Sequence, residues 1–164
     1  MKRLLKLLHE LAGIGITGAL ACQLVLLARA PADITLPAYA ALRQAIVAIH
    51  GWILLPSLAL VLVSGLAAMA VHYPFAQSRW VWAKAITGIG LLEGTLVIVM
   101  GTGRRAAELV TDAPSSADTA ALMSELMRTE WIGLWTVFAL CMVNVVLGVL
   151  RPRLDWPRAK PRPA

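Results

Sequence analysis

The chain has 164 residues, of which 59% are hydrophobic and 15% are charged, and its mean hydropathy is +0.75. Soluble domains carry about 25% charged residues, so this composition excludes an ordinary soluble domain and indicates a membrane protein. The net charge is +6, but the basic residues flank apolar runs and form no stripe interleaved with aromatics, so we expect no nucleic-acid partner. We expect the lipid bilayer, with its anionic headgroups, to be the surface that the chain contacts.

The first apolar run predicts a transmembrane helix over residues about 4–28. Its basic start is typical of a secretory signal, but the run is too long for the apolar core of such a signal. A second helix is predicted over residues about 40–71. It is longer than a bilayer requires, so we expect it to tilt or to stand partly in the interface. Pro56 lies in its middle and should kink it.

The third and fourth helices are predicted over residues about 79–101 and 131–150. The link between the second and third helices is so short that the two must run antiparallel. The third helix contains Gly90-xxx-Gly94, a pattern that favours close approach of another helix. We expect residues 106–130 to form a polar connection that contains a short amphipathic helix lying on the membrane surface.

These elements predict an all-α fold, a polytopic membrane four-helix bundle that forms a single domain over residues 1–150. A basic, proline-rich tail follows at 151–164. Ten of the 15 Lys and Arg residues would share the side of the two termini, and five would lie on the other side. The positive-inside rule therefore predicts an N-in, C-in orientation with a cytoplasmic tail.

This topology places three candidate cofactor-binding residues near the cytoplasmic face, namely His9, His72 and Lys84. Neutral imidazole is the commonest side-chain metal ligand and binds haem iron axially, and the cores of helix bundles hold such cofactors. His9 and His72 would thus be ligands to the iron of haem b, with Lys84 nearby. A plainer interpretation, which also stays open, is that terminal His and Lys side chains simply extend to the headgroups.

Other polar side chains lie inside the predicted spans, where they are costly and therefore functional candidates. His50 lies on the side opposite His72, about 33 Å away along the helix axis at about 1.5 Å per residue, so the two cannot share one ligand. Glu93 is the deepest formal charge; it would either pair with Asn144 or Thr17 or relay protons. Three uncharged side chains are expected to form hydrogen bonds between helices: Thr17, Gln23 and Asn144.

Motifs of known enzyme chemistry are absent from the sequence. It has no HExxH, GxSxG, Walker or GxGxxG pattern in a suitable setting. The two cysteines lie in apolar spans and form neither a CxxC metal pair nor a CxxCH haem-attachment site. The sequence therefore identifies no catalytic residue, and whether the protein is an enzyme stays open.

Three stretches carry a resemblance to known proteins: KLLHELAGIGITGAL, PSLALVLVSGL and RWVWAKAITGIGLL. Over roughly residues 5–105 the chain resembles a group of small bacterial four-helix membrane proteins. This group includes an uncharacterised family of predicted integral membrane proteins, the copper-resistance CopD-type domain and the HemJ-type protoporphyrinogen oxidase. The uncharacterised family is the most similar of the three. The resemblance implies a multi-pass protein of the bacterial cytoplasmic (inner) membrane.

The HemJ-type resemblance implies roles for two residues. An early histidine of the first helix, matched here by His9, and a lysine of the third helix, matched by Lys84, are associated in that family with b-type haem and porphyrin chemistry. HemJ-type proteins also carry a later histidine on the lysine face of the third helix. This chain has Thr95 on that face, a departure that weighs against the oxidase activity.

The sequence thus leaves three functional hypotheses. The first is a membrane protein that binds b-type haem or a related porphyrin near the cytoplasmic face and acts in electron transfer, with quinone as a potential partner. The second is a non-catalytic accessory or assembly subunit of a larger membrane complex, or a homo-oligomer. The third is copper or proton translocation that uses Glu93 and the histidines.

Overall fold

The computed structural model describes residues 2–30, 35–71, 79–112 and 117–150, and these are helical except at Arg29, Ala30 and Thr35. They form four long helices, two of which change to π-helical geometry partway along. The first is α1 and the fourth is α7; the second is α2, η1 and α3 in succession, and the third is α5, η2 and α6. The bounds are α1 Lys2–Ala28, α2 Leu36–Ile49, η1 His50–Leu54, α3 Leu55–Val71, α5 Arg79–Glu93, η2 Gly94–Met100, α6 Gly101–Asp112 and α7 Ala117–Leu150.

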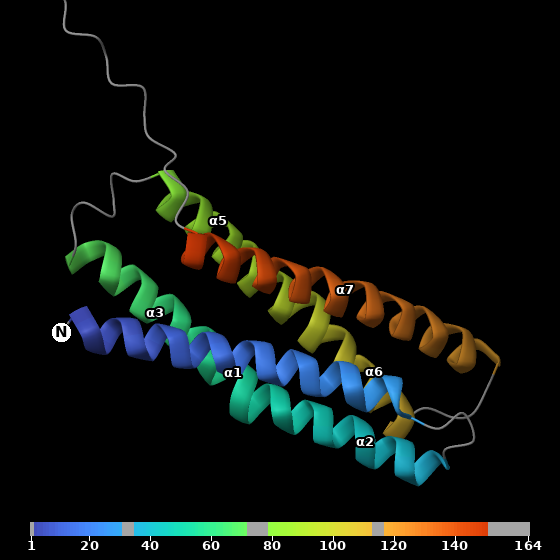
Figure 1. Cartoon of the computed structure of the whole chain (residues 1–164). Coiled ribbons are helices and arrows are strands. Elements are labelled where there is room, and N and C mark those ends of the chain that lie inside the picture. The colour runs from blue at the N-terminus through green and yellow to red at the C-terminus, as the bar shows by residue number, and fades with distance from the viewer. Residues whose placement is uncertain (1, 31–34, 72–78, 113–116, 151–164) are drawn as a thin grey trace, which may run out of the picture.

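The four helices lie side by side in an elongated antiparallel bundle (Figure 1). Each contains a stretch long and apolar enough to cross a membrane: Arg3–Ala28, Pro37–Val71, Val81–Val110 and Ala121–Leu150. The predicted fold class, an all-α four-helix membrane protein, is confirmed. The N-in, C-in orientation stays a prediction, since it concerns the side of the membrane and not the fold.

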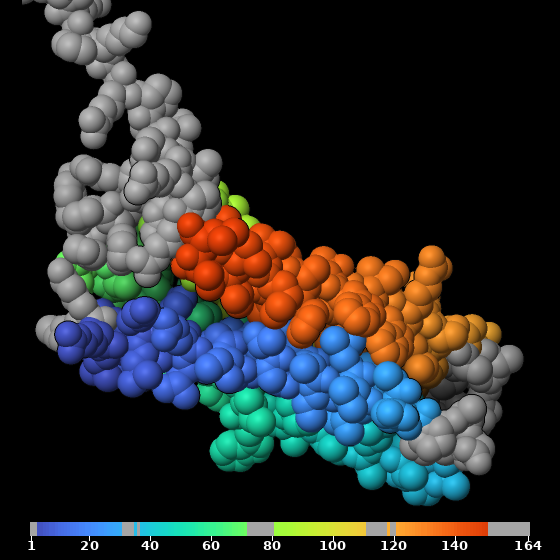
Figure 2. Space-filling model, viewed as in Figure 1, coloured from blue at the N-terminus to red at the C-terminus, as the bar shows by residue number. Residues whose placement is uncertain are grey.

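Each helix has a preferred neighbour. The first helix packs mainly on α3, α2 packs on α6, and α7 runs along α5, η2 and α6. The face in Figure 2 is made by α1 and α7, with α2 beside α1. The helices of two pairs approach closely because a glycine lacks a side chain there: Gly15 lies against Ser57 and Gly133 lies against Ile98.

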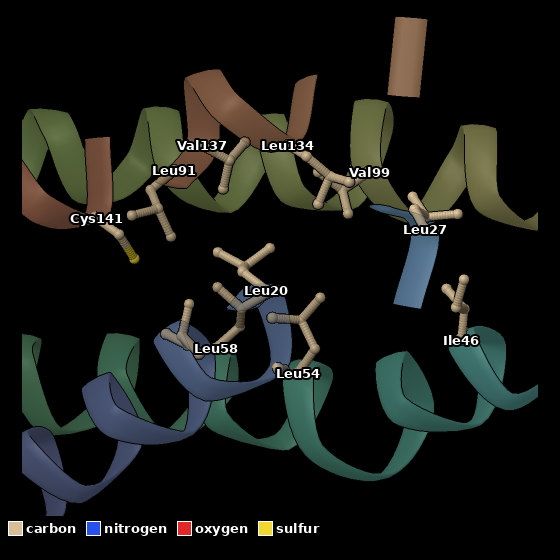
Figure 3. Packing of buried hydrophobic residues seen from close by; sticks show 12 residues of the cluster. Leu20, Leu27, Ile46, Leu54, Leu58, Leu91, Val99, Leu134, Val137 and Cys141 are labelled. Carbon is tan, nitrogen blue, oxygen red and sulfur yellow. The ribbon is translucent and has the colours of Figure 1, made fainter. Parts of the chain in front are cut away.

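The middle of the bundle is filled by aliphatic side chains from all four helices (Figure 3). Leu20, Leu54, Leu58, Leu91 and Leu134 are at most 5% exposed. Large apolar side chains also cover the outside, since Ile14, Trp52 and Val149 are more than 70% exposed. In water such a surface would be very unfavourable, but it suits a chain whose solvent is hydrocarbon.

The second helix changes geometry just before Pro56, the residue expected to kink it. The π-helical turn η1 covers His50–Leu54, and the backbone N–H of Leu55 donates to the carbonyl of His50, five residues back. A proline ring clashes with the carbonyl four residues earlier, and a wider turn relieves that clash. The proline therefore coincides with a π-helical turn that begins at His50.

The boundaries of the third and fourth helices differ from the prediction. The third helix does not end near Gly101, because that residue keeps right-handed helical dihedrals, φ −63° and ψ −48°, and α6 continues to Asp112. The fourth helix begins at Ala117 and not near Trp131. The expected connection at 106–130 is thus mostly helix. Its amphipathic pattern reflects helices with one face packed on the bundle, since Ala106 and Ala107 are buried while Arg104, Arg105 and Glu108 are exposed.

Candidate functional site

Two polar clusters lie in the bundle, one toward each end. Along α1, Gln23 follows His9 by 14 residues, or about 21 Å at 1.5 Å per residue. We call the group around the first histidine the His9 cluster, which comprises His9, Ser64, Lys84, Thr87 and Asn144. We call the group at the other end the ion-pair cluster, which comprises Gln23, Tyr39, Arg43, His50 and Glu130.

His9 is held by the second helix of the bundle. Its Nδ1 lies 3.0 Å from the carbonyl oxygen of Val61 and 3.1 Å from the Ser64 hydroxyl. A carbonyl only accepts hydrogen bonds, so Nδ1 carries the proton and Nε2 of the neutral ring keeps its lone pair. Gly65 faces the edge of the ring, because a Cβ added there would lie 3.3 Å from Cε1 of His9.

Lys84 lies on α5, in the third helix of the bundle. It lies against Gly148 of α7, where an added Cβ would be 2.8 Å from the Lys84 Nζ. The Lys84 ammonium is close enough to the His9 imidazole for the two to interact electrostatically. Next to Lys84, Asn144 donates a 2.9 Å hydrogen bond to the Thr87 hydroxyl. The structure thus brings two of the three predicted cofactor-binding residues to one end of the bundle. His72, the third, lies outside the described residues.

The ion-pair cluster is centred on Arg43 and Glu130, which come from the second and fourth helices. One guanidinium nitrogen of Arg43 lies 2.6 Å from Oε2 of Glu130, and both side chains are only 1% exposed. The other two nitrogens donate to the hydroxyl of Tyr39, one turn earlier, at 2.6 and 3.0 Å. Buried charges are tolerated only when they are paired and hydrogen-bonded in this way.

Gln23 of α1 extends this network to His50. Its amide nitrogen donates to Oε1 of Glu130 at 2.9 Å, and its amide oxygen lies 2.8 Å from Nε2 of His50. Because that oxygen accepts, Nε2 of His50 carries the proton. Nδ1 of His50 is buried and has no hydrogen-bond partner among the described residues. Gly103 packs over this ring, since a Cβ there would be 3.3 Å from Cε1 of His50.

The remaining predicted polar residues take different positions. Thr17 donates to the carbonyl of Gly13 and contacts the sulfur of Cys141, so its hydroxyl is used within its own helix and toward α7. Glu93 is exposed on the outside of the third helix, and no hydrogen bond or salt bridge joins it to Asn144 or Thr17. Glu93 and the two described histidines therefore do not line one common path through the described part of the bundle.

Sequence reasoning missed three members of the ion-pair cluster. Arg43 was counted only as a flanking charge, Tyr39 was not considered, and Glu130 was assigned to the polar connection. The spacing of Tyr39 and Arg43, four residues apart on one helix face, was an available signal. Another was the position of Glu130 directly before an apolar run, where its carboxylate cannot avoid the membrane.

Comparisons with known proteins found no relative of this chain. No family model matches this chain, and no curated protein and no solved structure matches it either. The likeness to HemJ-type and CopD-type proteins stays a prediction.

Proposed function

We propose that this membrane protein binds a b-type haem or a related porphyrin at the His9 cluster, where Nε2 of His9 would hold the iron. The observation that carries this proposal is the hydrogen bond between Nδ1 of His9 and the Val61 carbonyl. Histidines that bind metals almost always donate their other ring N–H to a carbonyl or carboxylate, which fixes the ring and makes the ligating nitrogen more basic. His9 has this arrangement. His50 also donates one ring N–H to a carbonyl oxygen, that of the Gln23 amide, but His50 is only 1% exposed and Gly103 packs over its ring.

The surroundings of His9 fit a porphyrin in two further respects. Gly13 lies one turn from His9 on α1, and no heavy atom lies within 4 Å of the position that a Cβ would take there, so the surface beside His9 would have room for a bulky group. Lys84 supplies a positive charge at the same end of the bundle, which suits the carboxylate groups that haem carries. A porphyrin brings four nitrogen ligands of its own, so one or two protein ligands suffice to hold its iron.

The chain's own residues would set the behaviour of the bound group. The Val61 carbonyl holds the His9 ring, the aliphatic core beyond the cluster excludes water, and Lys84 compensates negative charge. Haem itself would supply reversible one-electron transfer. A role in electron transfer within the membrane, with quinone as the exchange partner, is the function that we infer for this site.

The test is the ultraviolet–visible spectrum of the detergent-purified protein, expressed with added haem and recorded oxidised and dithionite-reduced. We expect a Soret band, with sharpened α and β bands on reduction, and we expect His9→Ala to abolish or shift it. His50→Gln is the matched control, because it changes the other described histidine and keeps a hydrogen-bonding side chain; its spectrum should equal that of the parent.

Lys84→Met sharpens the test. If Lys84 only compensates charge, this variant keeps the Soret band but has a lower reduction potential, since a positive charge nearby favours the reduced state. A colourless parent protein would overturn the proposal and leave the accessory-subunit hypothesis in its place. A Soret band that survives His9→Ala unchanged would show that His9 is not the ligand.

A further inference from the structure

Glu93 is an ionisable residue on the outside of a membrane-spanning helix. It lies near the middle of the span Val81–Val110 and is exposed. Its neighbours on this face are lipid-facing apolar side chains, with Ile86 68%, Ile89 57% and Val97 65% exposed. No hydrogen bond or salt bridge to Glu93 is present within the described residues. A carboxyl group facing hydrocarbon at this depth is costly unless another molecule supplies a partner.

The residues around Glu93 form a stripe suited to contact with a second helix. Ile86, Ile89, Gly90, Glu93 and Val97 recur at spacings of three and four, which places them along one face of the helix. Gly90 is exposed, and no heavy atom lies within 4 Å of the position of its missing Cβ. Gly94, by contrast, faces inward against Val137. Of the predicted Gly90-xxx-Gly94 pattern, only Gly94 is used inside the bundle, so Gly90 is available for close approach from outside.

We propose that this stripe is the contact face of a homodimer in which Glu93 of one copy pairs with Glu93 of the other. All copies of a membrane protein insert with the same orientation and at the same depth. A two-fold axis along the membrane normal therefore brings each residue of the stripe opposite its own counterpart. Two carboxyl groups that face each other can hydrogen-bond, with the O–H of a protonated group donating to a carboxyl oxygen of the other. No third charge is needed.

A second copy is favoured over a basic partner helix by the distribution of charge on this chain. The exposed cations within the described residues, among them Lys6, Arg104, Arg105 and Arg128, lie toward the ends of the helices, so none of these cations lies at the depth of Glu93. A like carboxyl group is present at that depth in every copy. The proposal involves no residue of the His9 cluster, so it stands or falls independently of haem binding.

The experiment measures dimerisation of the full chain in lipid vesicles, by Förster transfer between labelled copies over a series of protein-to-lipid ratios. We expect the parent to dimerise and Glu93→Leu to dimerise about 5- to 30-fold more weakly, the range typical of one hydrogen bond between membrane helices. Glu93→Gln should keep most of the dimer, since two amides can also bond to each other. Glu10→Leu, which removes an exposed carboxylate near the end of α1, is the matched control and should leave the dimer unchanged.

Crosslinking locates the face. In a chain with Cys22 and Cys141 replaced by Ala, Ile89→Cys should crosslink on oxidation. Val63→Cys should not, although Val63 of α3 is slightly more exposed, at 63% against 57% for Ile89. A monomeric parent at all ratios, or a dimer that persists in Glu93→Leu, would overturn the proposal. Glu93→Gln that dissociates as fully as Glu93→Leu would also overturn it, because Glu93 would then need a cation from another protein.

Discussion

The two polar clusters are built in a similar way, but their histidines differ in how far they are buried. Each is built on a histidine whose Cε1 edge faces a glycine, at 3.3 Å from a Cβ that would be added to Gly65 or to Gly103. His50 is only 1% exposed, whereas His9 is half-buried. A backbone carbonyl holds Nδ1 of His9, whereas the Gln23 side chain holds Nε2 of His50.

This difference separates a structural polar network from a site that can accept a ligand. In the ion-pair cluster, the buried side chains of Gln23, Arg43 and Glu130 join α1, α2 and α7 by hydrogen bonds and an ion pair, so the cluster fixes how these helices meet. In the His9 cluster, Nε2 of His9 makes no hydrogen bond within the described residues, and the ring is half-buried. We therefore assign helix assembly to the ion-pair cluster, and ligand binding at the His9 cluster stays our proposal.

The largest expected effect comes from breaking the buried ion pair. Glu130→Leu leaves the Arg43 guanidinium enclosed without a carboxylate, and we expect the free energy of unfolding to fall by about 3–5 kcal/mol. The measurement is an unfolding titration in detergent, followed by circular dichroism. The matched comparison is the exposed Lys6–Glu10 pair near the other end of α1, whose side chains are 66% and 59% exposed. Glu10→Gln should cost less than about 0.5 kcal/mol.

The double variant Arg43→Met, Glu130→Leu separates the ion pair from general packing. Replacing both members of a buried pair by apolar residues is often close to neutral, so the double variant should recover most of the lost stability. If the single variant Glu130→Leu were as stable as the parent, Arg43 would have to reach water or lipid headgroups. The two clusters would then not differ in how well they are shielded from solvent.

An intermediate effect is expected at the two glycines that face the histidines. Gly103→Ala forces a methyl group against the enclosed ring of His50, which Gln23 prevents from moving, and should lower the free energy of unfolding by about 1–2 kcal/mol. Gly65→Ala meets His9 at the same distance, but that ring is half-buried and can shift, so the loss should be under about 1 kcal/mol. Unfolding titrations of both variants give the comparison.

Gly88→Ala is the control for these two substitutions, because no heavy atom lies within 4 Å of its missing Cβ. It should be neutral or more stable than the parent by up to about 1 kcal/mol, through helix propensity alone. If Gly65→Ala destabilised the protein as much as Gly103→Ala, the two histidines would be equally rigid and enclosure would not distinguish them.

The smallest effect is expected within the His9 cluster. Asn144→Leu removes the hydrogen bond to the Thr87 hydroxyl, which should cost about 0.6 kcal/mol, the mean for such bonds in membrane bundles. Thr87→Val should cost about the same. The two changes together should cost less than the sum of the two single losses, since they remove one shared interaction. The sum is not fully halved, because Asn144 also lies 3.5 Å from the carbonyl of Lys84 and Thr87 also donates to the carbonyl of Ala83. Fully additive losses would show that the bond between Asn144 and Thr87 contributes nothing.

Much of the candidate site could be predicted from the sequence, but the pairing in the ion-pair cluster could not. His9 and Lys84 could be placed at one depth because each lies near a helix end on the same side of the bundle. The pairing of Arg43 with Glu130 joins residues 87 positions apart, and no local pattern encodes such a contact. The helix limits were also misjudged, because Gly101 and Gly103 are ordinary helix breakers in isolation, whereas packing on α2 and α7 keeps them helical.

The sequence by itself determined that this is a four-helix membrane protein, because hydrocarbon accepts only long apolar helices whose backbone groups are bonded internally. It also marked His9, His50 and Glu93 as costly residues that need a reason to be there. Only the tertiary structure decided the surroundings of each of these residues. Lateral packing enclosed His50 in a polar network, left His9 half-buried, and directed Glu93 outward. These outcomes depend on which helix faces meet, and helix rotation is set by contacts between distant segments and not by local sequence.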